Sequence, residues 1–305
     1  MQAARHVARV ALGAAAGPDT MARMFQHLPP PPDLMPWVEA AVVVRSTAAL
    51  PHTRFPAMVA SMLVLRLAGT VQRGDGPVPA AAWISPSTRP TQYQHLGPVH
   101  AVGLVLRPEA APALWAGAQA QIDVVWPLDA LTRSARGIPE AAAAAQAWAC
   151  TAHAVRAAPD DHRRLALLFD HLRALAAPPS PCDALRADAL AWLQAAQHPP
   201  DAQGLRQGLG PRQFERRFAA QWGRTPKQWA VTARLNRALA RALAQPSDTA
   251  AELATAQGYY DQSHWGRDLR RLAGAALQTL RASGQTPGDA HWPLQVGAQS
   301  QAPQD

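Results

Sequence analysis

The chain has 305 residues, which is enough for two domains with a hydrophobic core each. It carries 29 Lys and Arg against 21 Asp and Glu, a formal net charge of +8, and Lys227 is its single lysine. Arginine suits nucleic-acid binding, although a GC-rich coding preference produces the same bias. Two cysteines without paired spacing exclude a disulfide framework and a cysteine zinc site, and no apolar run reaches the roughly 20 residues of a membrane helix, so we expect a cytoplasmic protein.

Residues 1–28 are predicted to be a disordered tail. They carry Arg5 and Arg9 among alanines and lack the sustained apolar core of a signal peptide. Met21 and Met24 are alternative starting points of translation.

Residues 29–176 are predicted to form the first domain. After four prolines come short apolar runs separated by turn residues, which predict a small, mostly antiparallel sheet or barrel; the runs are 40–45, 58–67, 80–84, 91–96 and 101–106. Helical periodicity follows over 110–117, 139–157 and 161–176. In the last helix Leu165, Leu168 and Leu172 belong to an apolar stripe that is either core or a dimer seam, and we favour core.

A proline-rich linker, 177–182, ends this domain because its prolines cannot continue a helix. Residues 183–282 are predicted to be helical, and 283–305, rich in Gln, Pro and Gly, to be a disordered tail. Residues 183–281 hold 13 arginines and Lys227 against six Asp and two Glu, a net charge of +6. Most of the formal charge therefore lies in a third of the chain, as expected for a nucleic-acid-binding domain.

Two helix-turn-helix units are predicted in this region. In the first, a turn at 208–210 precedes a helical stretch at 211–223 with Phe214, Phe218 and Trp222 facing inward. In the second, a helix capped by Thr249 and Glu252 ends at Gly258, and a helix follows with Trp265, Leu269 and Leu272 inward. A helix over 228–244 connects the two units.

These residues resemble the AraC/XylS family of bacterial transcription regulators. The family pattern is matched by 212–218, by Gly223-Arg224-Thr225-Pro226, by 234–238, and in the second unit by Glu252-Leu253-Ala254, Gly258-Tyr259, 261–264 and Arg267. Residues 29–176 also look like the sensor region of one branch of the family, through Trp37, Ser85-Pro86, Arg107-Pro108 and Trp126-Pro127-Leu128-Asp129. The chain departs from the pattern at Gln203-Gly204, at Leu269 and at Gly274-Ala275-Ala276-Leu277.

The resemblance implies an α+β protein of two domains, with an N-terminal sheet or barrel followed by helices and an all-α C-terminal domain. Matching motif positions assigns base reading to Arg212, Glu215, Arg216, Gln262, Ser263, His264 and Arg267. Phosphate contacts are assigned to Arg234, Arg237, Arg270 and Arg271. For His264 a role in stabilising the turn is an equal alternative.

The first domain offers candidates for a small-molecule effector pocket, namely Arg66, Trp83, Tyr93 and Arg107, but filling of the barrel explains the same residues and is the favoured reading. His52, His95 and His100 lack the spacing of a metal site, and no phosphate loop or nucleophile elbow is present, so we expect no metal, no cofactor and no enzyme.

The sequence therefore predicts a transcription regulator that binds double-stranded DNA in two successive major-groove segments. The resemblance leaves three further partners open: a small-molecule effector, RNA polymerase and a second copy of the chain. The alternatives are a protein-interaction adaptor with a degenerate DNA-binding domain and, less favoured, an enzyme with a regulatory tail.

Overall fold

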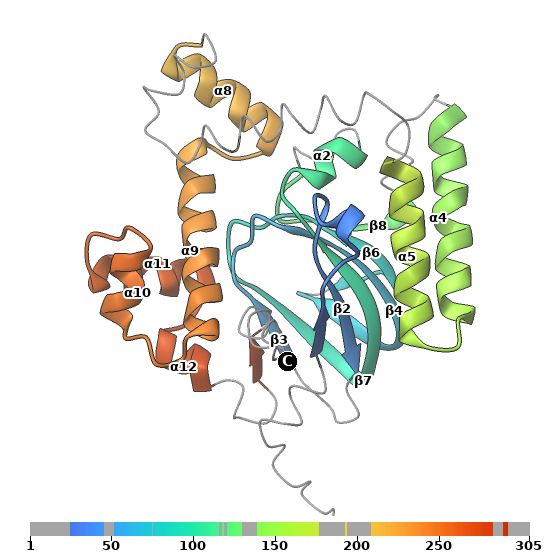
Figure 1. The fold of residues 1–305 in the computed structure, drawn as a ribbon, viewed down its shortest axis with the longest axis horizontal. Coiled ribbons are helices and arrows are strands. Elements are labelled where there is room, and N and C mark those ends of the chain that lie inside the picture. Colours follow the sequence, from blue (N-terminus) through green and yellow to red (C-terminus); the bar gives the residue numbers. More distant parts are fainter. Residues whose placement is uncertain are drawn as a thin grey trace, which may run out of the picture.

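The computed structural model describes residues 25–45, 52–74, 76–115, 121–129, 139–176, 209–282 and 289–291, with the single residues 118 and 193. A curved sheet lies at the centre of Figure 1, with two long helices along one side and the C-terminal helices on the other. The expected linker at 177–182 and the departure at Gln203-Gly204 lie outside the described residues.

Nine strands make up the described sheet: β1 Phe25–Leu28, β2 Val38–Arg45, β3 His52–Phe55, β4 Ser61–Arg73, β5 Gly76–Pro77, β6 Ala81–Ile84, β7 Thr91–Leu106, β8 Val125–Pro127 and β9 Asp289–His291. Their order is β1-β2-β7-β4-β6-β8, with β3 also on β7, β5 on β4 and β9 on β3. All these pairs are antiparallel except β3 with β9. The prediction of a mostly antiparallel sheet is confirmed.

Three sequence-based boundaries were wrong. Phe25–Leu28 pairs with β2, so the expected tail at 1–28 runs four residues too far, and Asp289–His291 pairs with β3 inside the expected tail at 283–305. The predicted strands at 91–96 and 101–106 are one strand, β7, because Gly97 adopts a φ of 88° and lets the chain continue past Pro98.

Close strand packing depends on Gly103 in β7. A Cβ atom at this position would collide with the carbonyl oxygen of Leu63 on the neighbouring strand β4. Glycine therefore allows β7 to pair with both β2 and β4 in the valine-rich centre of the sheet.

Helices α4 (Pro139–Ala157) and α5 (Asp161–Ala176) cover one face of the sheet, and α2 (Ala110–Leu114) follows β7. Leu165, Leu168 and Leu172 of α5 are buried in one cluster with Trp83 and Trp148. The apolar stripe of α5 is therefore core, as favoured from the sequence, rather than an exposed dimer seam.

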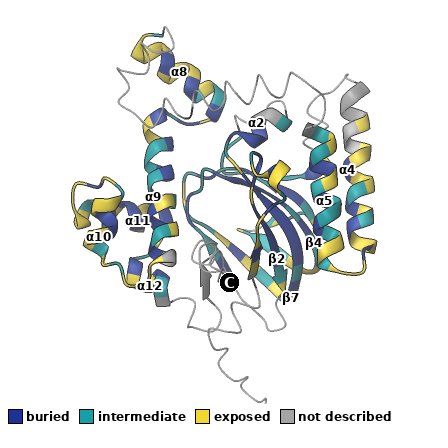
Figure 2. Cartoon of the chain, in the orientation of Figure 1, coloured by how far each residue is buried: buried dark blue, intermediate teal, exposed yellow. Residues whose placement is uncertain are grey.

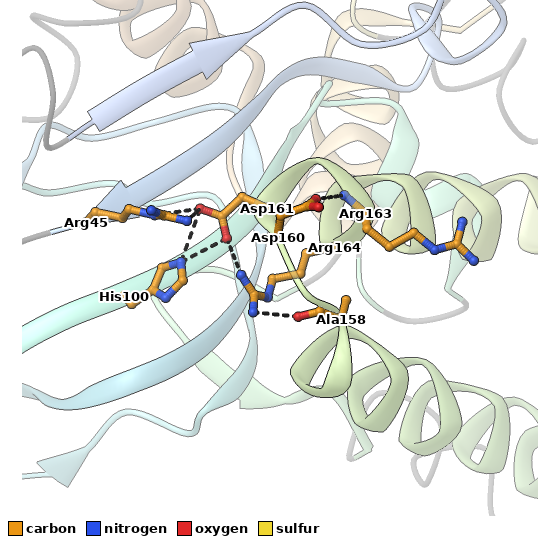
Figure 3. A network of polar contacts seen from close by, with 7 residues as sticks. All are labelled: Arg45, His100, Ala158, Asp160, Asp161, Arg163 and Arg164. Atoms are coloured by element: carbon orange, nitrogen blue, oxygen red, sulfur yellow. Dashed lines mark hydrogen bonds and ion pairs between the residues drawn. The ribbon is translucent and has the colours of Figure 1, made fainter.

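A polar network ties the start of α5 to the sheet (Figure 3). The Asp161 carboxylate accepts hydrogen bonds from Arg45 Nε at 2.7 Å and Arg164 Nη1 at 2.7 Å, and lies 2.9 Å from His100 Nε2. Partial burial raises the pKa of Asp161, but hydrogen bonds from Arg164, His100 and Arg45 outweigh this and hold the pKa below its usual value. The network fixes α5 on strands β2 and β7.

Within the described residues, the helices of the C-terminal domain are α8 (Pro211–Trp222), α9 (Pro226–Ala244), α10 (Ala250–Ala256), α11 (Gln262–Ala273) and α12 (Leu277–Ala282). It has two hydrophobic clusters. One joins α8 to the first half of α9 through Phe214, Phe218, Trp222, Trp229 and Ala233, and the other joins the second half of α9 to α10, α11 and α12. No helix in the described residues is both long and apolar enough to cross a membrane.

Candidate nucleic-acid interface

The first candidate reading helix is α8. Pro211 begins it, and Gly223, with a φ of 65°, ends it. Phe214, Phe218 and Trp222 are buried as predicted, which leaves the other side of the helix in solvent (Figure 2). The predicted base-reading residues on α8, all exposed, are Arg212, Glu215 and Arg216.

The second candidate reading helix is α11, which follows α10 after a turn at Gly258 with a φ of 70°. Asp261 caps α11, since its carboxylate accepts a hydrogen bond from the His264 backbone N–H at 2.6 Å. Trp265 and Leu269 are buried on the inner face. Gln262, Ser263 and Arg267 are exposed on the outer face, where the sequence predicts base contacts.

Helix α9 supports both units. The Thr225 hydroxyl accepts from the Gln228 backbone N–H, and the Gln228 side chain accepts from the Thr225 N–H, which forms a capping box at its start. The same device caps α10 through Thr249 and Glu252, as predicted. One capped helix thus carries two short helices whose outer faces are polar.

The predicted phosphate contacts divide into two kinds. Arg237 and Arg270 are exposed, and Arg271 is largely exposed although it pairs with Asp268 at 2.7 Å. Arg234 is different, because its Nη1 donates to the Gly258 carbonyl at 3.3 Å and its guanidinium carbon lies 4.1 Å from the Tyr259 ring centroid. The structure therefore gives Arg234 contacts inside the domain, and its expected phosphate contact stays a prediction.

His264 lies in the first turn of α11, next to the turn that precedes this helix. Its ring meets the Tyr259 ring edge to face with centroids 5.4 Å apart, and its Nε2 is 3.9 Å from the Asp268 carboxylate. Of the two roles left open by the sequence, these contacts favour stabilisation of the turn.

Residues 206–283 match the family model of a helix-turn-helix domain, which is of the AraC type. This region is an AraC-type helix-turn-helix domain. The match confirms the resemblance seen in the sequence for this part of the chain, and the AraC-type domain is a DNA-binding domain of transcription regulators. No curated protein matches the chain.

Solved structures of ToxT from Vibrio cholerae are similar at a low level. One is 8% identical, covers 77% of this chain and 95% of its own, and has a TM-score of 0.43. Wild-type ToxT with a bound unsaturated fatty acid is 8% identical, covers 82% of this chain and 97% of its own, and has a TM-score of 0.41. Such scores are too low to assign a ligand or a DNA target to this chain.

Sequence reasoning missed the contacts of two residues of the AraC-type domain and the exposure of a third. Asp268 is nearly buried and lies among Arg271, Arg234 and His264. Asn236 on α9 bonds to the sheet domain through its side-chain amide. Tyr260 is 93% exposed beside the start of α11. The spacing of four residues between His264 and Asp268 could have predicted their contact on one face of a helix, whereas no local pattern marks Asn236.

A cavity of about 90 Å³ lies in the sheet domain. Its walls are mainly valines, with Thr53, Arg66, Tyr93 and His95 as polar members. Burial lowers the pKa of Arg66 and raises the pKa of Tyr93 to about 12. Two of the four predicted pocket residues are therefore at the cavity.

The other two predicted pocket residues lie elsewhere. Trp83 is fully buried in the cluster that packs against α4 and α5. The Arg107 guanidinium donates to the Met35 carbonyl at 2.6 Å. The burial of Trp83 fits the filling of the core, the reading favoured from the sequence, because periodicity does not say which face of a strand lies under the helices.

Two of the three histidines considered as metal ligands from the sequence form hydrogen bonds within the sheet. His95 lies 2.8 Å from the Thr53 hydroxyl, and His52 lies 3.0 Å from the Gln92 amide. Within the described residues no group of three or more His, Cys, Asp or Glu side chains could hold a metal ion.

Proposed function

We propose that the protein is a sequence-specific transcription regulator that reads two successive major-groove segments of double-stranded DNA. The observation that carries this proposal is the pair α8 and α11, each with a buried aromatic face and an exposed polar face, on the single helix α9. Helices of this kind place their N-terminal residues against base edges, and segments one helical turn apart are about 34 Å apart.

The proposed base contacts come from the exposed residues of both helices. Arg212, Arg216 and Arg267 can donate two hydrogen bonds to guanine, and Gln262 can pair with adenine. Glu215 can accept from cytosine or orient Arg216, and Ser263 can contact either type of base. His264 is proposed to act mainly through the turn, for the reasons given above.

Proposed phosphate contacts set the register on the duplex. Arg237, Arg270 and Arg271 remain candidates because their guanidinium groups reach solvent. Tyr260 joins them as a neutral contact, since residues next to the start of a reading helix lie at the edge of the groove.

We also propose that residues 29–176 sense a small molecule and that 183–282 bind DNA. The cavity suits a chiefly apolar effector with a polar group, because most of its lining residues are apolar and Thr53, Arg66, Tyr93 and His95 are polar. Phe55 on the cavity wall is two residues from Ala57, whose backbone bonds to α11, so an occupant has a short route to the reading helices. Such an effector acts only if it binds two arrangements of the domains with different affinities.

The proposal is tested by binding to DNA from upstream of the protein's own coding region. We expect salt-dependent binding that Arg216→Ala with Arg267→Ala abolishes. The matched control is Arg156→Ala with Arg163→Ala, which removes the same charge from exposed positions on α4 and α5. Equal binding by both double variants would refute the site assignment, and binding without sequence preference would favour the adaptor reading.

A further inference from the structure

Residues 57–59 of the sheet domain are hydrogen-bonded to the AraC-type domain through their backbone. The Ala57 N–H donates to the Leu272 carbonyl of α11 at 2.6 Å. The Asn236 side chain on α9 donates from Nδ2 to the Ala57 carbonyl at 2.8 Å and accepts at Oδ1 from the Val59 N–H at 3.1 Å. One amide therefore satisfies a donor and an acceptor two residues apart on the same segment.

The side chains of this segment enter the hydrophobic clusters of both helix-turn-helix units. Ala57 is fully buried in the second cluster, which contains Leu239 and Trp265. Val59 packs against the first cluster, which contains Phe218 and Trp229. Two residues from another domain thus complete two different cores.

Ser87 holds the segment from the side of the sheet domain. Its backbone N–H donates to the Met58 carbonyl at 2.9 Å, and its hydroxyl accepts from the Met58 N–H at 3.0 Å. The Ser87 carbonyl in turn accepts from Arg224 Nη1 at 3.4 Å, and Arg224 is 3% exposed in the loop between α8 and α9. The two loops that carry residues 57–59 and Ser87 therefore contact the first helix-turn-helix unit, α9 and the end of α11.

We propose that residues 57–59, here called the brace, fix the two helix-turn-helix units relative to each other, with Asn236 as the positioning residue at the centre of the brace. This rests on the proposed function. Without the brace, the two hydrophobic clusters would be connected through helix α9. A single helix can bend along its length. A second connection that enters both clusters restricts that bending and so fixes the spacing at which α8 and α11 meet DNA.

The test compares operators of different spacing. A bound sequence selected from random DNA by the full-length protein is altered by inserting one base pair between its two segments. For the wild type we expect the insertion to weaken binding by about tenfold or more, as for loss of one or more base contacts. The quantity compared is the affinity for the selected operator divided by the affinity for the operator with the insertion. For Asn236→Ala this ratio should fall to about a third of the wild-type ratio or less, because the units can then adjust to the new spacing.

Two further variants keep the result interpretable. Gln278→Ala removes an exposed amide from α12 of the same domain and should leave the ratio unchanged. If Asn236→Ala does not fold, Ser87→Ala weakens the hold of the sheet domain on the brace by removing the hydroxyl that accepts from the Met58 N–H, leaves the AraC-type domain unaltered, and should change the ratio in the same direction. An unchanged ratio in folded Asn236→Ala or Ser87→Ala would overturn the brace. Absence of sequence-specific binding by the wild type would instead overturn the proposed function.

Discussion

The guanidinium carbon of Arg234 lies 4.1 Å from the centroid of the Tyr259 ring, which joins helix α9 to the turn of the second helix-turn-helix unit. The same guanidinium donates to the Gly258 carbonyl at 3.3 Å and lies 3.7 Å from the Asp268 carboxylate. A partly buried cation with an aromatic face, a carbonyl and a carboxylate around it stabilises the domain that holds it.

Arg234→Ala should lower the free energy of unfolding by about 1–3 kcal/mol, because it removes the cation–π contact and leaves Asp268 with fewer partners. Chemical unfolding of the full-length protein measures this. Arg237→Ala is the matched control, since it should leave stability unchanged and reduce the slope of log affinity against log salt by about 0.9. A reduced salt slope with unchanged stability in Arg234→Ala would support the phosphate role instead.

Stability should fall as the pH is lowered from about 6.5 to 4, because three buried histidines resist protonation. Burial lowers the pKa of His27, His95 and His171 from 6.5 to about 4. Between these values the unfolded chain binds more protons than the folded chain, so their contribution is complete above pH 6.5 and is lost as the pH falls.

His171→Gln should therefore weaken the dependence of stability on pH, as measured by unfolding at pH 7.5 and pH 5, whereas His153→Gln, at an exposed position, should not. Equal dependence in both variants would contradict the assignment of the effect to burial.

Tyr260→Ala should weaken DNA binding by about two- to tenfold, since a neutral hydrogen bond contributes on the order of 0.5–1.5 kcal/mol. Its melting temperature should match that of the wild type because the side chain is 93% exposed. Tyr260→Phe removes the hydroxyl and keeps the ring, so it distinguishes the contribution of the hydroxyl from that of the ring. Unaltered affinity in Tyr260→Ala would place this residue away from the DNA.

Arg267→Ala should relax sequence specificity more than Arg212→Ala does. The start of α11 is fixed by the Asp261 cap, whereas α8 follows Gly210 without a side-chain cap bond, so α11 is held more firmly for base reading. Each lost bidentate contact reduces discrimination by about 1–3 kcal/mol at its base pair. Affinities for operators with single substitutions measure this, and greater relaxation in Arg212→Ala would reverse the ranking of the two helices.

Local chemistry explains which features were predictable. The aromatic spacing of α8, the Thr249–Glu252 capping box and the glycine turn at Gly258 are patterns within a few residues, and the structure contains all three. The face of the sheet on which a side chain lies was harder to predict, because alternation along a strand does not say which face the helices cover. Trp83 lies on the face covered by α4 and α5.

Contacts between distant segments carried no sequence signal. Asn236 and Ala57 are 179 positions apart, and nothing in either neighbourhood marks the pair. Arg234 was assigned to the outer face of α9 by spacing, but Tyr259 from the following unit covers it. The pairing of Phe25–Leu28 with β2 likewise depends on a partner strand that composition does not reveal.

The central claim, that two helices read two segments of DNA, is tested most directly by selecting bound sequences from random DNA with the wild-type protein and with Arg216→Ala and Arg267→Ala singly. The account predicts two enriched blocks whose centres are about one helical turn, roughly 10 base pairs, apart. Arg216→Ala should erase one block and Arg267→Ala the other. A single block, or loss of the same block in both variants, would contradict it.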